Sequence, residues 1–142
     1  MKGKAENMKK VIEFLTENPV FYFATVEGYR PKVRPCHYFM EYKGRFYFGI
    51  GKHRSTYKQM LANPNVELCT MSEDGRWLRV RGVAQFDNSA DALAAAMEKM
   101  KGVKERYNEA TGKECGLVYL DYAEAELEGD DGEIERWKLV KE

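Results

Sequence analysis

The pattern of apolar positions predicts a chain that begins with one helix and continues mainly as strands. In residues 7–18, Met8, Val11 and Leu15 recur at the spacing of an amphipathic helix, and Asn18-Pro19 ends it. Beyond this helix, segments rich in β-branched and aromatic residues alternate with glycine-containing turns, which is typical of an antiparallel meander. The predicted strands span residues 20–26, 32–42, 45–50, 65–71, 76–86, 114–128 and 133–140.

Further helical segments interrupt these strands. Residues 54–63 have the pattern of a short helix, with Ser55 or Thr56 as its N-cap. Residues 89–101 are rich in alanine, and residues 103–110 extend that helical region. Long strands in a short chain leave edges to protect, and closure into a barrel protects them. We therefore expect a single β-dominated α+β domain over residues 1–142, with six to seven strands and flanking helices, for which closure into a barrel is one solution.

Composition narrows the classes of protein to consider. The chain has 142 residues, of which 44% are hydrophobic and 13% aromatic, enough for one core without disulfides or a structural metal. Its 23 basic and 23 acidic residues give zero formal net charge, which argues against a nucleic-acid partner, including binding by a small barrel with surface aromatics. Cys36, Cys69 and Cys115 have no Cys-x-x-Cys spacing, so we expect free thiols and a cytoplasmic location. The sequence shows no secretory signal and no long apolar run, so no membrane partner is expected.

The stretch from Arg34 to Pro64 is the richest in chemically useful residues. Arg54, Ser55 and Thr56 stand at the predicted helix start, with Lys58 one turn further on. A helix N-terminus offers unpaired N–H groups and a positive dipole end, and hydroxyls and cations at that end suit a phosphate. Just before it, glycines at positions 49 and 51 would let a planar ring approach the backbone. The alternative interpretation of the pattern is a solvated basic loop.

The order of the elements resembles a known family. A helix and Asn-Pro precede Phe-x-Phe-Ala-Thr-Val at residues 21–26, followed by Arg34-Pro35 and an aromatic strand ending in Tyr47-Phe48-Gly49. Tyr57-Lys58-Gln59 and the segment 76–82, Arg-Trp-Leu-Arg-Val-Arg-Gly, continue the series. This ordered set resembles the pyridoxamine 5'-phosphate oxidase-like family over about residues 8 to 128. Within the family it is similar to the short general-stress and nitroimidazole-resistance type relatives. The resemblance implies a six- to seven-stranded split β-barrel with flanking helices, and FMN bound at a homodimer interface.

The resemblance also implies which residues contact FMN. Arg34, Arg54, Ser55 and Thr56 match phosphate-binding positions, and Lys58 lies just beyond them. The residues on the two strands that would line the flavin ring are Cys36, His37, Tyr38, Phe39, Gly49, Ile50 and Gly51. Trp77 matches a position near the flavin or at the dimer seam.

The chain departs from the family pattern at two places. Ile50-Gly51 replaces the usual Thr-Asn pair, which removes side-chain hydrogen bonds to the ring. Residues 124–142 lack the arginine-and-histidine motif that holds the substrate phosphate in the biosynthetic oxidase. This second departure argues against pyridoxamine 5'-phosphate oxidation.

The implied function is an FMN-dependent oxidoreductase of the flavin, nitro or quinone reductase type, acting on an unknown small acceptor. Because the flavin carries the electrons, such a protein needs a cradle and a pocket rather than an acid–base triad. The alternatives are a non-catalytic flavin or haem-binding protein, and a deazaflavin in place of FMN. His37 is then a haem ligand, a proton donor near the flavin or a structural histidine. The arginines of residues 76–81 either frame an anionic acceptor or form a solvated strand face.

Overall fold

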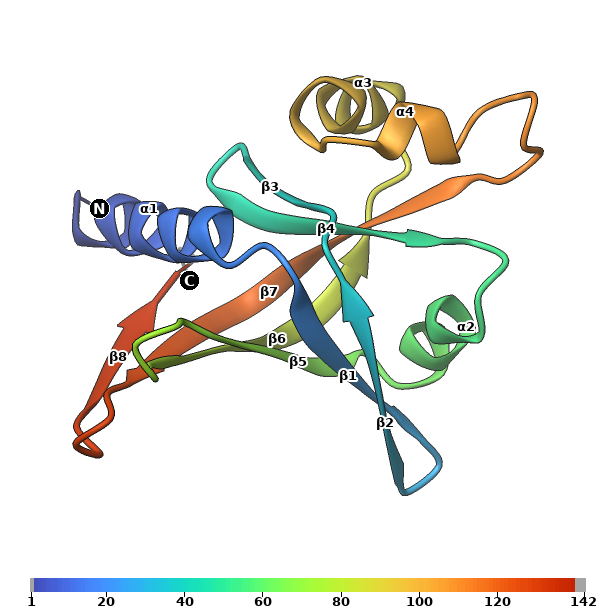
Figure 1. The fold of residues 1–142 in the computed structure, drawn as a ribbon. Helices are drawn as coiled ribbons and strands as arrows, with labels where there is room; N and C mark the ends of the chain where they lie inside the picture. The colour runs from blue at the N-terminus through green and yellow to red at the C-terminus, as the bar shows by residue number, and fades with distance from the viewer. Residues whose placement is uncertain (1, 140–142) are drawn as a thin grey trace.

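The chain forms one antiparallel sheet that curls strongly (Figure 1), and apolar side chains fill its interior. This computed structural model describes residues 2–139, except for the side chain of Lys2. Within that range the helices are α1 (Lys2–Glu17), α2 (Ser55–Ala62), α3 (Ala90–Lys99) and α4 (Val103–Arg106). The strands are β1 (Phe21–Glu27), β2 (Arg30–Cys36), β3 (Phe39–Tyr42), β4 (Arg45–Gly51), β5 (Asn65–Met71), β6 (Trp77–Phe86), β7 (Cys115–Glu128) and β8 (Ile134–Lys138). None of these helices is both long and apolar enough to cross a bilayer.

The strands follow the order β2-β1-β5-β6-β7-β4-β3, with β8 paired to β7. The long strand β7 pairs with β6 along one edge. Along its other edge, residues 115–119 pair with β4 and residues 124–128 pair with β8. Neighbouring strands in this order are antiparallel, and so are β7 and β8. The expected β-dominated α+β architecture of split-barrel type is confirmed.

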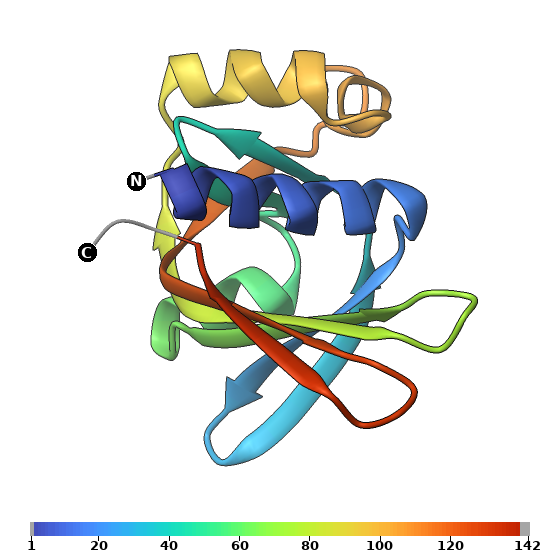
Figure 2. The ribbon, with the colours of Figure 1, turned by 90° about the vertical axis from the view of Figure 1, so that its left-hand side faces the viewer.

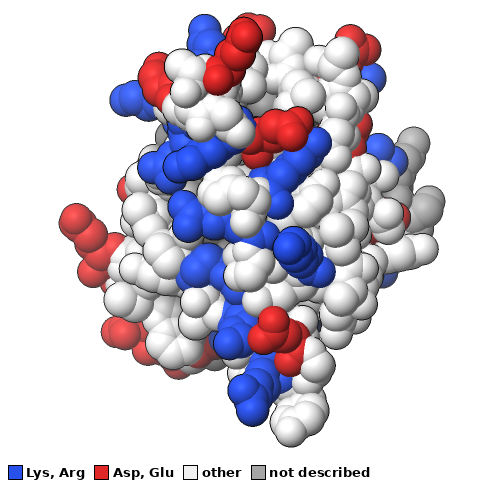
Figure 3. Space-filling view, turned by 90° about the vertical axis from the view of Figure 1, so that its right-hand side faces the viewer, with Lys and Arg blue, Asp and Glu red and all other residues white. Residues whose placement is uncertain are grey.

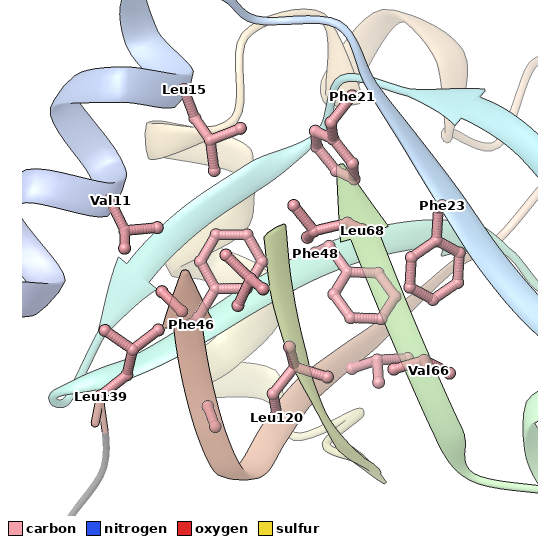
Figure 4. Close-up of a cluster of buried hydrophobic side chains, with 14 of the residues drawn as sticks. Val11, Leu15, Phe21, Phe23, Phe46, Phe48, Val66, Leu68, Leu120 and Leu139 are labelled. Atoms are coloured by element: carbon pink, nitrogen blue, oxygen red, sulfur yellow. The ribbon is translucent and has the colours of Figure 1, made fainter. Parts of the chain in front are cut away.

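The curl of the sheet is visible in contacts between strands that are not neighbours. Phe23 of β1 and Phe48 of β4 have ring centroids 4.6 Å apart, and Phe21 packs edge-on against Phe39 of β3 at 6.2 Å. In Figure 4 the β1 and β4 phenylalanines point into one interior, which Val11 and Leu15 of α1 cover. Strands four steps apart in the sheet order can only meet in this way if the sheet is strongly curved.

Alternation of side chains separates this interior from the outside of the sheet. In β1, Phe21, Phe23 and Thr25 are buried while Tyr22 is exposed, as expected for a strand with one buried face. Strand β4 is buried on both faces, because α3 and α4 pack over its outer face (Figure 2). The second core formed there includes Tyr38, Met40, Tyr47, Ala92, Ala96, Met100, Val103, Tyr107, Cys115 and Leu117.

The structure corrects several predicted boundaries. The strand expected over residues 32–42 is two strands, because β2 pairs with β1 at one end of the sheet order and β3 pairs with β4 at the other. The chain changes partners at His37 and Tyr38, which raises the number of strands in the described range to eight. Helix α1 begins earlier than expected, and α4 ends at Arg106 instead of extending to 110. Val140, in the last predicted strand, lies outside the described residues.

The contact between Phe23 and Phe48 gives a stability prediction. Replacing Phe23 with alanine removes a fully buried ring, so we expect the free energy of unfolding to fall by about 3–5 kcal/mol. Urea unfolding at a fixed protein concentration measures the change. Tyr29→Ala is the matched control, since this side chain is 91% exposed and its loss should alter stability by about 0.5 kcal/mol or less. A Phe23→Ala change as small as the control's would contradict a closed interior.

Candidate functional site

The first feature of the site is the uncapped start of α2. The helix follows β4 and lies beside β1 (Figure 1), with Thr56, Gln59 and Met60 buried. Its N-cap is Arg54, in extended conformation, whose side chain makes no capping hydrogen bond. Helix α3, by contrast, is capped by Ser89, whose Oγ accepts from the backbone of Ala92 at 3.2 Å. The prediction of Ser55 or Thr56 as N-cap is wrong, because both residues are already helical. An arginine cannot accept a hydrogen bond, so this helix start suits an external anion.

Cations gather on the side of the molecule that carries this helix start. Figure 3 shows a band of lysine and arginine across the face where α2, the β1–β2 hairpin and the α4 region lie. Arg54, Ser55 and Lys58 are exposed, and Thr56 is buried at 5%. Among the residues that the structure describes, Arg54 and Lys58 have no carboxylate within ion-pair distance, and the first turn of α2 contains no acidic residue. No described carboxylate therefore neutralises the positive charge at this point.

Arg34 of β2 lies beside α2 and is held by two other elements, β1 and α2. Its Nη1 donates to Thr25 Oγ1 at 2.8 Å and to the carbonyl of Phe23 at 3.2 Å. Its Nη2 donates to Gln59 Oε1 at 2.8 Å, which joins β2 to α2. Burial lowers the pKa of Arg34 from its usual value, but a guanidinium is so strong a base that it keeps its charge at neutral pH. The structure therefore places the Arg34 charge near α2, as the sequence interpretation requires.

Sequence reasoning did not find Thr25 and Gln59. Each is a polar residue at a position that the apolar pattern assigns to the interior: Thr25 follows Phe21 and Phe23 on the inward face of β1. Gln59 precedes Met60 on the buried face of α2. A polar residue at a predicted buried position needs a hydrogen-bond partner, and that was the available signal.

The two segments expected to line the ring do lie side by side. The backbone N–H of Gly49 donates to the carbonyl of Tyr38 at 3.1 Å, and Cys36 Sγ lies 3.7 Å from the Gly49 carbonyl oxygen. Tyr38 and Ile50 are buried in the chain, whereas Cys36 and Phe39 are half-buried. His37 is exposed in the connection between β2 and β3, with its ring edge-on to Tyr38. The accessible side chains of this strip are thus those of Cys36, His37 and Phe39, on the stretch from Cys36 to Phe39.

Packing within the chain also favours glycine at positions 49 and 51. A Cβ at Gly49 would lie 3.0 Å from Cys115 Sγ, and one at Gly51 would lie 2.5 Å from the His53 ring. The chain's own side chains therefore fill the space that a larger residue would need.

Comparison with known proteins identifies the family. A family model described as pyridoxamine 5'-phosphate oxidase matches residues 8–125. The solved structure of a NimC/NimA family protein from Clostridium acetobutylicum is 33% identical, with a TM-score of 0.88, covering 97% of this chain and 96% of that one. The chain belongs to the pyridoxamine 5'-phosphate oxidase family. The resemblance seen in the sequence is confirmed.

More distant solved structures share the fold of this pyridoxamine 5'-phosphate oxidase family member. General Stress Protein 26 from Bacillus anthracis is 15% identical, with a TM-score of 0.65, covering 90% of this chain and 96% of that one. A heme binding protein from Mycobacterium smegmatis is 14% identical, with a TM-score of 0.70, covering 95% of this chain and 57% of that one. At these identities the likeness shows the fold alone. No curated protein sequence matches the chain.

Trp77 lies apart from the other predicted site residues in this family member. Trp77 pairs with Met71 at one end of the β5–β6 ladder. Helix α2 lies at the opposite end, where Asn65 pairs with Val83. Six residues separate Trp77 from Val83, which is roughly 20 Å of extended strand. Its indole N–H donates to Met71 Sδ at 3.1 Å. One chain therefore does not bring Trp77 to Arg54.

The outer face of the sheet carries arginines of a different kind. Arg79 lies 3.1 Å from Glu128, and Arg81 lies 3.2 Å from Glu126 and 3.4 Å from Glu124. The Arg81 hydrogen bond and the neighbouring guanidinium groups lower the pKa of Glu126, so this carboxylate is ionised at neutral pH. Because the carboxylates neutralise Arg79 and Arg81, the interpretation of this row as the frame of an anionic pocket is not supported by this single chain.

The three cysteines are free thiols, as expected. Burial raises the pKa of Cys36 to about 11 and that of Cys115 to about 11. A thiol with so high a pKa is almost wholly protonated at neutral pH and is a poor nucleophile. The chemistry of the site therefore has to come from something other than a cysteine thiolate.

Proposed function

We propose that this family member binds FMN with its phosphate at the start of α2 and acts as an FMN-dependent oxidoreductase on a small acceptor. The observation that carries the proposal is a helix start, at Arg54, that no side chain of the described residues caps, with Arg34 held against Gln59 of the same helix. Backbone N–H groups, a hydroxyl at Ser55 and unneutralised cations form a donor set suited to a phosphate dianion. The family resemblance supplies FMN as the ligand that this donor set fits.

In this proposal the residues of the chain bind and orient the cofactor. FMN, when bound, supplies the redox chemistry. Arg54, Ser55 and Lys58 hold its phosphate from the helix start, and Arg34 holds it from β2. The strip from Cys36 to Phe39, beside Gly49, provides the surface along which the ring lies. A nitro compound, a quinone and oxygen are the acceptors to test.

The proposed assembly is a homodimer, with a second chain completing each site. Arg54 and His37 are exposed in one chain, while a groove of about 950 Å³ lies elsewhere, between α1 and the β3–β4 turn. The outer face of the sheet exposes large apolar side chains, among them Tyr22, Val33, Met71 and Trp77. Exposed apolar surface of this kind marks an interaction site, and two-fold symmetry is its commonest form. In such a dimer, Trp77 near the flavin ring would come from the second chain.

A haem-binding role is the second candidate. It is favoured by the exposure of His37, an accessible imidazole on the strip proposed for the ring. The solved relative from Mycobacterium smegmatis is described as a heme binding protein. In this alternative, haem occupies the strip and His37 ligates its iron.

The phosphate assignment predicts that the chain binds FMN more tightly than riboflavin. A charge-assisted hydrogen bond contributes on the order of 1.5–3 kcal/mol, so Arg54→Ala should weaken FMN by about tenfold to a hundredfold and leave riboflavin unchanged. Quenching of flavin fluorescence measures both affinities, and Lys9→Ala on α1 is the control. Equal affinities for the two flavins in the wild type would overturn the assignment. A Soret band in place of flavin bands in the purified protein would favour haem.

The dimer is tested by mass in solution. We expect light scattering at micromolar concentration to give twice the 16.5 kDa mass of the chain. Val33→Arg places a charge on an apolar side chain that is 68% exposed on β2, and should shift the protein toward the monomer. Ala94→Arg adds the same charge to the exposed side of α3 and should leave the dimer intact. A monomeric wild type would rule out the proposed assembly.

The enzymatic part predicts acceptor-dependent reoxidation. The FMN complex, reduced chemically without oxygen, is mixed with a nitroaromatic, a quinone or oxygen in a stopped-flow spectrometer. We expect at least one acceptor to reoxidise the bound flavin faster than it reoxidises free reduced FMN, because the chain orients both reactants. If free reduced FMN reacts faster with all three, the protein is a flavin carrier or sensor instead.

A further inference from the structure

Three polar side chains from three elements form a closed hydrogen-bonded ring behind the proposed phosphate site. Thr25 Oγ1 of β1 lies 2.6 Å from Gln59 Oε1 of α2. Arg34 of β2 donates to both: from Nη1 to the threonine oxygen at 2.8 Å and from Nη2 to the glutamine oxygen at 2.8 Å. Each pair within the triad is therefore joined directly.

The ring has a single consistent set of donors. Arginine has no acceptor, so the oxygens of Thr25 and Gln59 must both accept from Arg34. The threonine hydroxyl then directs its only hydrogen to Gln59, whose amide must turn its oxygen toward the two donors. Thr25 is 1% exposed and Gln59 is 8% exposed, so water does not readily replace these partners. The orientation of the guanidinium is thereby fixed from behind.

The covalent geometry of arginine determines which edge remains for a ligand. Nη1 and Nη2 together form the end-on edge, and Thr25 and Gln59 occupy that edge. The Nε–H and the second hydrogen of Nη2 point together from the side edge, the other bidentate face of a guanidinium. No hydrogen bond from Nε to a described residue is present, and the side chain is half-buried rather than enclosed. The side edge is thus both available and fixed in direction.

We propose that Thr25 and Gln59 are positioning residues that hold the side edge of Arg34 toward the FMN phosphate and thereby set the preference for FMN over riboflavin. The inference rests on the proposed function, because it assumes that FMN binds at α2. It adds two residues that do not touch the ligand. They act by removing rotational freedom from Arg34, which would otherwise be lost on binding.

The test compares Thr25→Val with Thr25→Ser. Valine keeps the shape of threonine but removes the hydroxyl, so the ratio of riboflavin to FMN dissociation constants should fall about tenfold, the loss of roughly one oriented hydrogen bond. Serine keeps the hydroxyl and should retain the wild-type ratio. Thr70→Val is the matched control: Thr70 is 5% exposed on β5, and its hydroxyl donates to the carbonyl of Val20 at 2.9 Å. It should lower thermal stability without changing the ratio.

A thermodynamic cycle shows whether the effect passes through Arg34. Thr25→Val should change the ratio much less in an Arg34→Lys background, because a lysine has no side edge to be held. Gln59→Met removes the other acceptor and serves if Thr25→Val does not fold. An unchanged ratio in a folded Thr25→Val or Gln59→Met variant overturns the inference while leaving FMN binding intact. Equal loss of FMN and riboflavin binding also overturns it, as that indicates a structural role only. A wild type without a preference for FMN overturns both the inference and the phosphate assignment.

Discussion

The contact of Phe23 with Phe48 across the interior is the constraint on which the rest of the structure depends. β1 and β4 are separated by three strands in the sheet order, yet their rings lie 4.6 Å apart. Burial of two such rings is a large favourable contribution that a flat sheet cannot obtain. Once the sheet curls to make this contact, β2 at one end and β3 at the other are brought within two residues of each other. The chain can then pass from one to the other through His37 and Tyr38 alone.

This closure also explains why polar groups can be held so precisely at α2. The helix joins β4 to β5, two strands that are not adjacent in the sheet, so it must lie across the end of the curled sheet. Met60 is fully buried in the interior, which anchors the helix. The preceding residue, Gln59, lies on the same buried face and points toward β1. The position of Gln59 is thus set by hydrophobic packing, and the hydrogen bonds to Thr25 and Arg34 only refine it. A site built on two strands and an anchored helix is more rigid than one built on a loop.

Some of this could be predicted from the sequence, and some could not. The helical spacing of apolar residues predicts α1, and the alternation of Phe21 and Phe23 with other residues predicts β1, because each element buries one face. The break at His37 could not be found in the same way, since the apolar pattern continues while the pairing partner changes. The cations of the sequence mark the turn before α2, but the N-cap is Arg54, one or two residues earlier than the expected Ser55 or Thr56. Gln59 was read only as part of a family motif, because its partners are 25 and 34 residues away along the chain.

The chain has zero net charge, but its charges are distributed unevenly, and this distribution supports the proposed phosphate site at α2. On the outer face of the sheet, Glu124 stands opposite Arg81 and Glu126 stands opposite Arg79, so these two cross-strand pairs are neutral. At α2 the described residues supply no carboxylate to Arg54 or Lys58. Exposed cations close together repel one another, which costs stability unless an anion offsets it. The described residues thus neutralise the arginines on one face and leave Arg54 without a carboxylate at a helix start, where the dipole adds to the positive potential. This arrangement supports the proposal that an external anion binds there.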